Sequence, residues 1–221
     1  FLIKTFVGAD LIAVLSGQTD DLEQHIGWIK MFQSGYTVVA FLLPAVIMVR
    51  FLRQPVFFGL QAHQNINWMH LPLVAGIVFC AFPVVAMLLQ LNIDLAETGA
   101  FGWLAEELSQ NGENVERLVK AMLTTGSWWG LLLNIIIMAL LPAIAEEACF
   151  RGVMQRLLTR TFKDPHIAIA VTGFVFAAIH LQFDGILPRW FLGITLGYLY
   201  FWSANLWYPI IAHALYNGAQ V

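Results

Sequence analysis

The stretch AIAEEACFR, residues 143–151, places two adjacent carboxylates, Glu146 and Glu147, near the end of an apolar run that begins near Trp128. Arg151 follows four residues after the second carboxylate. A charged side chain in the middle of a membrane costs about 3 kcal/mol or more unless something offsets it. The stretch is therefore a candidate functional site, and the apolar run that holds it is the starting point for the fold.

The composition indicates a membrane protein. Of the 221 residues, 59% are hydrophobic and only 11% are charged, which is far from the average of soluble domains. The lipid bilayer is thus an expected partner, and we expect no nucleic-acid partner. The two cysteines, Cys80 and Cys149, both lie in apolar runs and have neither a disulfide nor a zinc-finger spacing.

The order of the apolar runs predicts an all-α fold, a polytopic transmembrane helical bundle of about seven helices. A membrane-spanning helix needs about 20 residues, or about 17 at the short end. The first run lacks the basic start and cleavage pattern of a signal peptide and is interpreted as the end of a membrane helix. The runs are Phe1–Ser16, Tyr36–Leu52, Leu71–Leu91, Trp128–Ala145, Ile167–Phe183, Ile186–Trp202 and Leu206–Ala219.

Nothing in the sequence divides the chain, so residues 1–221 are predicted to form a single transmembrane domain. Residues 1–91 hold the N-terminal helices, 92–127 an extramembrane amphipathic segment, and 128–219 the helices that carry the chemistry. We expect the amphipathic helix to pack on its neighbours, which is favoured over its lying alone on the outer leaflet. Its apolar face comprises Val115, Leu118, Val119, Met122 and Leu123.

The distribution of cations predicts the orientation. If all seven helices span, the loops that connect the apolar runs, together with Lys4, place seven Lys and Arg side chains on one side of the membrane and four on the other. The positive-inside rule makes the first side cytoplasmic and puts the C-terminus outside. The seven are Lys4, Arg50, Arg53, Arg151, Arg156, Arg160 and Lys163; the four are Lys30, Arg117, Lys120 and Arg189.

Helical spacing predicts that an imidazole lies beside a carboxylate. No strong helix breaker occurs between Glu146 and Lys163-Asp164-Pro165, although Pro142 is expected to kink the helix. Glu146 lies 17 residues before Lys163, and His180 lies 17 residues after it. At 1.5 Å per residue both lie about 25 Å from this turn. We therefore expect one water to be able to bridge Glu146 and His180.

The last predicted helix adds two polar groups to the same layer. His213 and Asn217 are four residues apart, so they share one helix face. Measured from the turn at Ala204-Asn205, His213 lies about 12 Å into the helix. This depth matches that of His180 loosely.

Three motifs in order, Glu146-Glu147-x-x-x-Arg151, Phe176-x-x-x-His180 and His213-x-x-x-Asn217, resemble those of the CPBP family. These are the CAAX-protease and bacteriocin-processing (Abi) membrane endopeptidases. The resemblance covers about residues 128–217. It implies an integral membrane hydrolase, in the plasma membrane of a bacterium, that cleaves a membrane-associated peptide or protein.

The resemblance also implies roles for six residues. Glu146 and His180 would hold and activate the attacking water, and His213 and Asn217 would stabilise the oxyanion. Glu147 and Arg151 would support the site as an i, i+4 ion pair. No cofactor is expected under this interpretation.

Two alternatives remain open. In a zinc-dependent protease, Glu146 or Glu147 with His180 and His213 would form the ligand set. In a non-catalytic immunity or scaffold protein, the same polar groups would only hold helices together, as membrane histidines and asparagines often do. The pair Gly193 and Gly197 is typical of close helix packing.

Overall fold

The computed structural model describes residues 22–99, 115–124, 126–182 and 185–221, and the described part consists of helices and their connections, without strands. The first predicted helix, Phe1–Ser16, and Lys4 lie outside these residues. The all-α helical bundle predicted from the apolar runs is confirmed.

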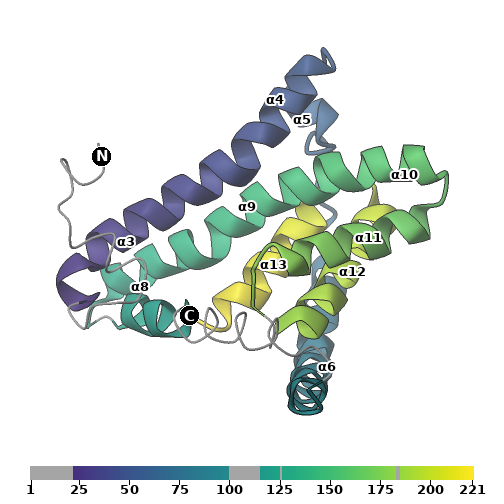
Figure 1. Cartoon of the computed structure of the whole chain (residues 1–221). Coiled ribbons are helices and arrows are strands. Elements are labelled where there is room, and N and C mark those ends of the chain that lie inside the picture. The colour runs from purple at the N-terminus through teal and green to yellow at the C-terminus, as the bar shows by residue number, and fades with distance from the viewer. Residues whose placement is uncertain (1–21, 100–114, 125, 183–184) are drawn as a thin grey trace, which may run out of the picture.

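Two long, apolar helical runs lie side by side in the bundle (Figure 1). The first consists of α3 (Leu22–Thr37), a π-helical segment (Val38–Leu42) and α4 (Leu43–Phe51). The second consists of α8 (Trp128–Asn134), a π segment (Ile135–Leu140), α9 (Leu141–Glu147), a second π segment (Ala148–Gln155) and α10 (Arg156–Phe162).

These runs are longer than their apolar stretches predicted. The first begins 14 residues before Tyr36, at Leu22, so Lys30 lies within a helix and its assignment to a loop was wrong. The second passes Pro142 without ending, and a π segment ends just before this proline. A π turn loosens the hydrogen-bond ladder, which accommodates a residue without an N–H donor.

The predicted break after the second run is confirmed. Lys163 adopts a left-handed φ of 56°, which ends α10. The Asp164 carboxylate then accepts hydrogen bonds from the backbone N–H groups of His166 and Ile167, with Pro165 in the first turn of α11. This is the usual chemistry of a helix start.

The C-terminal helices are α11 (Pro165–Ala178), α12 (Ile186–Ser203) and α13 (Trp207–Gly218), which pack on the other side of α8–α10 (Figure 1). α12 and α13 match the predicted runs closely. α11 is shorter than predicted, because it ends at Ala178 and Leu181 adopts a left-handed φ of 52°. His180 therefore lies just beyond the helix.

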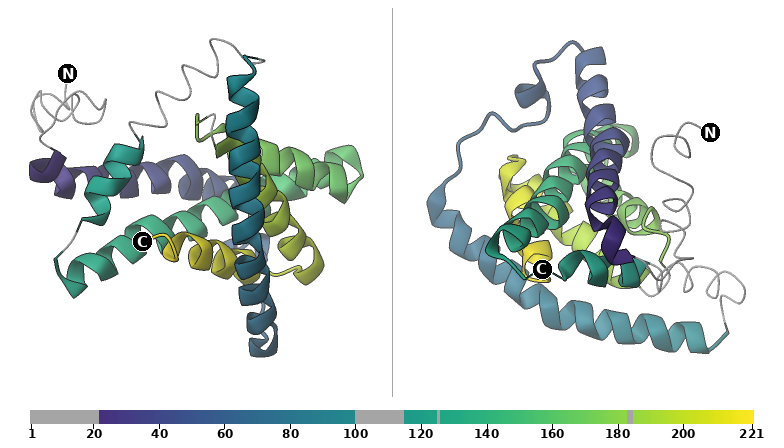
Figure 2. Two further views of the ribbon diagram at one scale, coloured as in Figure 1. Left: turned by 90° about the horizontal axis from the view of Figure 1, so that it is seen from below. Right: turned by 90° about the vertical axis from the view of Figure 1, so that its left-hand side faces the viewer.

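α6 (Leu71–Glu97) packs across α12 and α13 and lies apart from the α3–α4 run (Figure 2). It continues past the predicted end at Leu91. The buried Asn92 side chain accepts a hydrogen bond from the N–H of Leu187, 3.0 Å away. This contact fastens α6 to the start of α12.

Three helices of the described part are long and apolar enough to cross a membrane: His25–Phe51, Trp68–Glu97 and Trp128–Phe162. α11 and α13 have 14 and 12 residues, which gives about 21 and 18 Å against a hydrocarbon core of about 30 Å. The strict alternation of seven spans, on which the predicted outer C-terminus depended, is therefore not supported by helix length.

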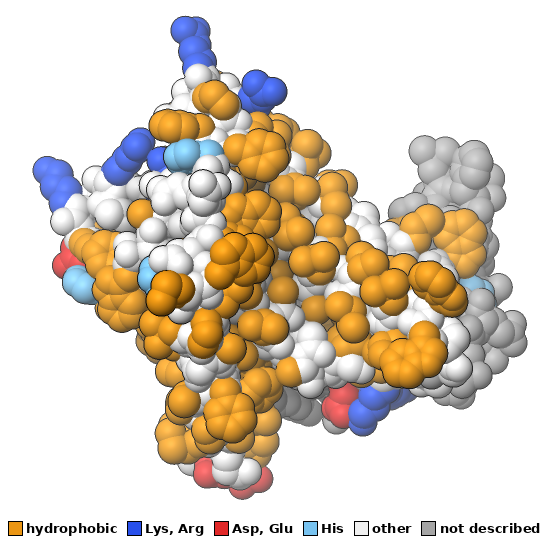
Figure 3. All heavy atoms as spheres, turned by 180° about the vertical axis from the view of Figure 1, so that it is seen from behind, with side chains coloured by type: hydrophobic (Ala, Val, Ile, Leu, Met, Phe, Trp, Pro, Cys, Tyr) orange, Lys and Arg blue, Asp and Glu red, His pale blue; other side chains and the backbone are white. Residues whose placement is uncertain are grey.

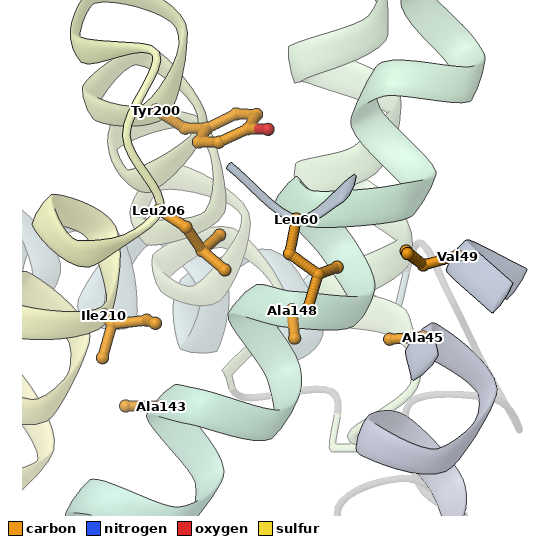
Figure 4. Close-up of a cluster of buried hydrophobic side chains, with 8 residues drawn as sticks. All are labelled: Ala45, Val49, Leu60, Ala143, Ala148, Tyr200, Leu206 and Ile210. Carbon is orange, nitrogen blue, oxygen red and sulfur yellow. The ribbon is translucent and has the colours of Figure 1, made fainter. Parts of the chain in front are cut away.

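The segment that connects α4 and α6 packs against other helices and is hydrogen-bonded to them. It contains the short helices α5 (Val56–Gly59) and Trp68–His70. Leu60, which is 5% exposed, points toward Ala148 and packs with Val49 in one buried cluster (Figure 4). The indole N–H of Trp207 donates to the Ala62 carbonyl at 2.9 Å, so the connection is tied to the start of α13.

Helical residues 115–123 pack on the long runs, as predicted. Met122 is 4% exposed and shares a buried cluster with Ile29 and Ile137, and Leu118 packs against it. The interpretation of this helix as packed on its neighbours is confirmed.

Candidate active site

The site is built around the ion pair that the i, i+4 spacing of Glu147 and Arg151 predicted. Arg151 Nη1 lies 2.8 Å from Glu147 Oε1, and both side chains are 0% exposed. Arg151 was therefore wrongly counted among the loop cations that set the orientation. A buried carboxylate and guanidinium this close neutralise each other, which offsets part of the cost of removing both from water.

A second helix holds the guanidinium in place. Arg151 Nη2 donates to the Gly193 carbonyl of α12 at 2.8 Å, and its guanidinium lies over the Phe176 ring, 5.1 Å from the centroid. One turn further along, Gln155 Nε2 donates to the Gly197 carbonyl at 3.0 Å. Two side chains of one helix thus reach two carbonyls four residues apart on α12.

The glycines make this approach possible. A Cβ atom on Gly193 would lie 2.7 Å from Gly173 Cα, and one on Gly197 would lie 2.9 Å from Ile169 Cγ2. The prediction that Gly193 and Gly197 serve close helix packing is confirmed. Sequence reasoning missed Gln155, although its position four residues after Arg151 and eight after Glu147 puts all three on one helix face.

His213 joins the two carboxylates. Its Nδ1 lies 2.9 Å from Glu147 Oε1, and its Nε2 lies 4.0 Å from Glu146 Oε2. Because a carboxylate accepts, the hydrogen on Nδ1 points to Glu147, which leaves Nε2 of the neutral ring without a proton. The sequence grouped His213 with Asn217 and did not predict its contact with Glu147.

His180 is oriented by a carbonyl. Its Nδ1 lies 2.8 Å from the Phe176 carbonyl oxygen, which can only accept. The hydrogen therefore resides on Nδ1, and Nε2 carries a lone pair. The Phe176 ring centroid lies 5.2 Å from that of His180 and 5.8 Å from that of His213, so Phe176 packs against both imidazoles.

One cavity brings four of the six predicted residues together. It has a volume of about 360 Å³ and is lined by Glu146, His180, His213 and Asn217. Glu147 and Arg151 do not line the cavity, and both side chains are fully buried. The Glu146–His180 bridge stays a prediction, but the two side chains share a cavity, as their equal offsets from Lys163 predict.

The cavity is apolar on the side away from the carboxylates. α6 contributes residues such as Ile77, Val78 and Val85, while α12 contributes Leu192, Leu196 and the cation Arg189. A chamber with a few convergent polar groups and otherwise apolar walls is typical of a ligand site.

The zinc alternative requires Glu146 or Glu147, His180 and His213 to converge on one ion. In the ranges that the structure describes, no group of three or more His, Cys, Asp or Glu side chains lies close enough to hold one. His213 and His180 each direct one ring nitrogen to Glu147 and to the Phe176 carbonyl. Cys149 is a free, half-buried thiol without a histidine partner among these residues.

Helices of membrane length and a buried layer of carboxylate, guanidinium and imidazole groups define a membrane protein with an internal polar site. Residues 127–219 match the family model "Type II CAAX prenyl endopeptidase Rce1-like", which is consistent with the CPBP resemblance. That family is a protease family, so the match supports an endopeptidase at family level. All six predicted site residues lie within the match, whereas α3–α6 lie outside it.

One curated relative is similar to the chain. "Uncharacterized protein YpbD" of Bacillus subtilis (strain 168) is 37% identical over 92 residues, which is 38% of this chain and 42% of that protein. The chain thus matches less than half of that relative's length. No solved structure matches the chain.

Proposed function

We propose that the chain is an intramembrane endopeptidase of the CAAX type, in a bacterial plasma membrane, that cleaves a membrane-associated peptide or protein with a water activated by Glu146 and His180. The observation that carries the proposal is the convergence of Glu146, His180, His213 and Asn217 on one cavity with apolar walls. The family match supports the protease class.

The tautomers suggest how the water is held. Glu146 as carboxylate and His180 Nε2 as lone pair are both acceptors, so they bind the two hydrogens of one water between them. The lone pairs of its oxygen are then free to attack a substrate carbonyl carbon. Glu146 takes one proton as the C–O bond forms and passes it to the leaving nitrogen as the C–N bond breaks.

The oxyanion requires donors, and the two candidates differ. The Asn217 amide carries N–H groups in every protonation state. His213 Nε2 donates only when the ring is protonated, because its Nδ1–H is directed to Glu147. We therefore assign Asn217 as the principal oxyanion donor and Glu147 with Arg151 as positioning residues that fix the His213 ring.

The test compares new peptide termini in membranes from cells that express the chain or Glu146→Gln. This substitution keeps the side-chain shape and removes the proton acceptor, so cleavage should fall at least about 100-fold. Glu116→Gln, at an exposed position outside the match, is the matched control and should cleave normally.

Two outcomes would overturn the proposal. Undiminished cleavage by Glu146→Gln would leave the non-catalytic interpretation. Loss of cleavage with a strong chelator, together with stoichiometric metal in the purified protein, would favour the zinc alternative; we expect neither.

A further inference from the structure

A second hollow shares no lining residue with the candidate active site and lies between the end of α4 and the π segment that leads into α10. Its apolar walls include Val49 and Leu52, and its polar lining comprises Gln54, Arg156 and Arg160. At about 20 Å³ it has room for about one water-sized group. A larger ligand would place one polar atom inside and lie across the mouth.

The guanidinium of Arg156 is fixed at this hollow. Its Nη1 donates to the Gly59 carbonyl and lies 3.5 Å from the Gly152 carbonyl oxygen. Both glycines lie in close packing, because a Cβ on Gly59 would meet Val49 and one on Gly152 would meet Leu60. Arg156 is therefore a pre-oriented cation rather than a mobile surface side chain.

Further cations surround the hollow. Arg50 and Arg53 are exposed at the end of α4, and Arg160 and Lys163 are exposed at the end of α10. Within the described ranges, no ion pair joins any of these side chains or Arg156 to a carboxylate. Figure 3 shows Lys and Arg side chains gathered at this end of the molecule. Such an excess of positive charge favours an anionic ligand.

The hollow lies where two apolar spans end together. The span His25–Phe51 ends beside Arg50 and Arg53, and the span Trp128–Phe162 ends beside Arg160. Large exposed aromatic side chains surround this level, including Phe51, Phe57 and Phe58 at 80%, 67% and 59% exposure. Cations next to exposed apolar rings at a span end are typical of the headgroup level of a bilayer.

We propose that this basic hollow, which Arg156 and Arg160 line and which Arg53 flanks between the lining residues Leu52 and Gln54, binds the phosphate of an anionic phospholipid. Guanidinium groups bind phosphate oxygens with two parallel hydrogen bonds, and basic pockets between membrane helices accommodate such headgroups. The exposed rings favour a membrane lipid over a soluble anion, because they would contact acyl chains. A zwitterionic headgroup would bind less tightly, because the arginines would repel its own cationic group.

The test is a lipid titration of the purified full chain in detergent, followed by native mass spectrometry. Phosphatidylglycerol and phosphatidylcholine with identical acyl chains are the two probes. We expect phosphatidylglycerol to bind at least about 25-fold more tightly, because two exposed arginines each contribute about fivefold. Each arginine near an anionic headgroup contributes about fivefold, so Arg53→Gln/Arg160→Gln should weaken phosphatidylglycerol binding roughly 25-fold and leave phosphatidylcholine unchanged.

The controls separate charge at the hollow from charge in general. Both substituted arginines are exposed, so the variant should keep its melting temperature, and Lys120→Gln on residues 115–123 should bind like the wild type. Equal affinity for both lipids, or an unchanged double variant, would overturn the proposal. Displacement by millimolar glycerol phosphate would also overturn it, because the ligand would then be a soluble anion.

Discussion

The described part of the chain contains two ion pairs with the same spacing and opposite surroundings. In the first, Lys120 Nζ lies 2.6 Å from Glu116 Oε1, with side chains that are 72% and 63% exposed. In the second, Arg151 Nη1 lies 2.8 Å from Glu147 Oε1, and both side chains are 0% exposed. The i, i+4 spacing predicts each pair, but burial decides how much each pair matters for the stability of the fold.

The two pairs differ because one is solvated by water and the other is not. Around Glu116 and Lys120, solvent and salt screen the attraction, and each partner is solvated well without the other. Glu147 and Arg151 have lost that solvation, and additional hydrogen bonds from His213 and to the Gly193 carbonyl compensate for it. Removing one partner there leaves the other as an uncompensated charge.

The largest expected effect is that of Arg151→Ala. It leaves Glu147 buried without its cationic partner, so the free energy of unfolding should fall by about 3–5 kcal/mol. Folded yield in membranes and the thermal unfolding midpoint of the purified protein measure this loss. Lys120→Ala is the matched control, and equal losses in the two variants would show that burial does not separate the pairs.

Asn217→Ala should affect chemistry rather than folding. Asn217 lines the cavity but belongs to neither ion pair. Loss of one oxyanion donor costs about 10²–10³ in turnover, so terminus-release rates should fall by this factor while the melting temperature stays near that of the wild type. A variant that unfolds as readily as Arg151→Ala would make Asn217 a structural residue instead.

Gly193→Ala tests how closely the buried pair depends on α12. The new Cβ would lie 2.7 Å from Gly173 Cα, and backbone cannot yield as a side-chain tip can. The two helices must separate, which should cost about 1–3 kcal/mol and lengthen the Arg151 contact. The control is Gly76→Ala in α6, where a Cβ meets nothing within 4 Å; thermal unfolding of both compares them.

The fold and part of the site follow from local sequence. Apolar run length predicts the helices, and the left-handed Lys163 with the Asp164-Pro165 start makes the break predictable. Shared depth from that break brings Glu146 and His180 to one cavity. These features depend on the spacing of residues along single helices, which can be read directly from the sequence.

Contacts between helices could not be predicted from the sequence. The contact of His213 with Glu147 joins residues 66 apart in sequence and depends on how α13 is rotated, which spacing along either helix does not define. The role of Gln155 depends on the backbone carbonyls of α12 in the same way. Helix length supports three spans within the described residues, because an apolar stretch at the length limit can form a helix of only 14 residues, as α11 does.

The smallest expected effect is at the exposed pair and depends on pH. The hydrogen bond from Lys120, with its positive charge, holds the pKa of Glu116 below its ordinary value. Since the folded pKa is lowered, the pair's contribution to stability is present above the ordinary glutamate pKa and disappears as pH falls through the lowered one.

In Lys120→Ala the pKa of Glu116 should therefore rise to its ordinary value, which carboxyl ¹³C NMR of glutamate-labelled protein detects. The melting temperature at neutral pH should not change measurably, because both side chains remain well solvated when separated. Added salt should reduce the pKa difference between wild type and variant, since it screens exposed charges. A clear loss of thermal stability in Lys120→Ala would mean that exposure does not make this pair weak, and the contrast with Glu147–Arg151 would have to come from geometry.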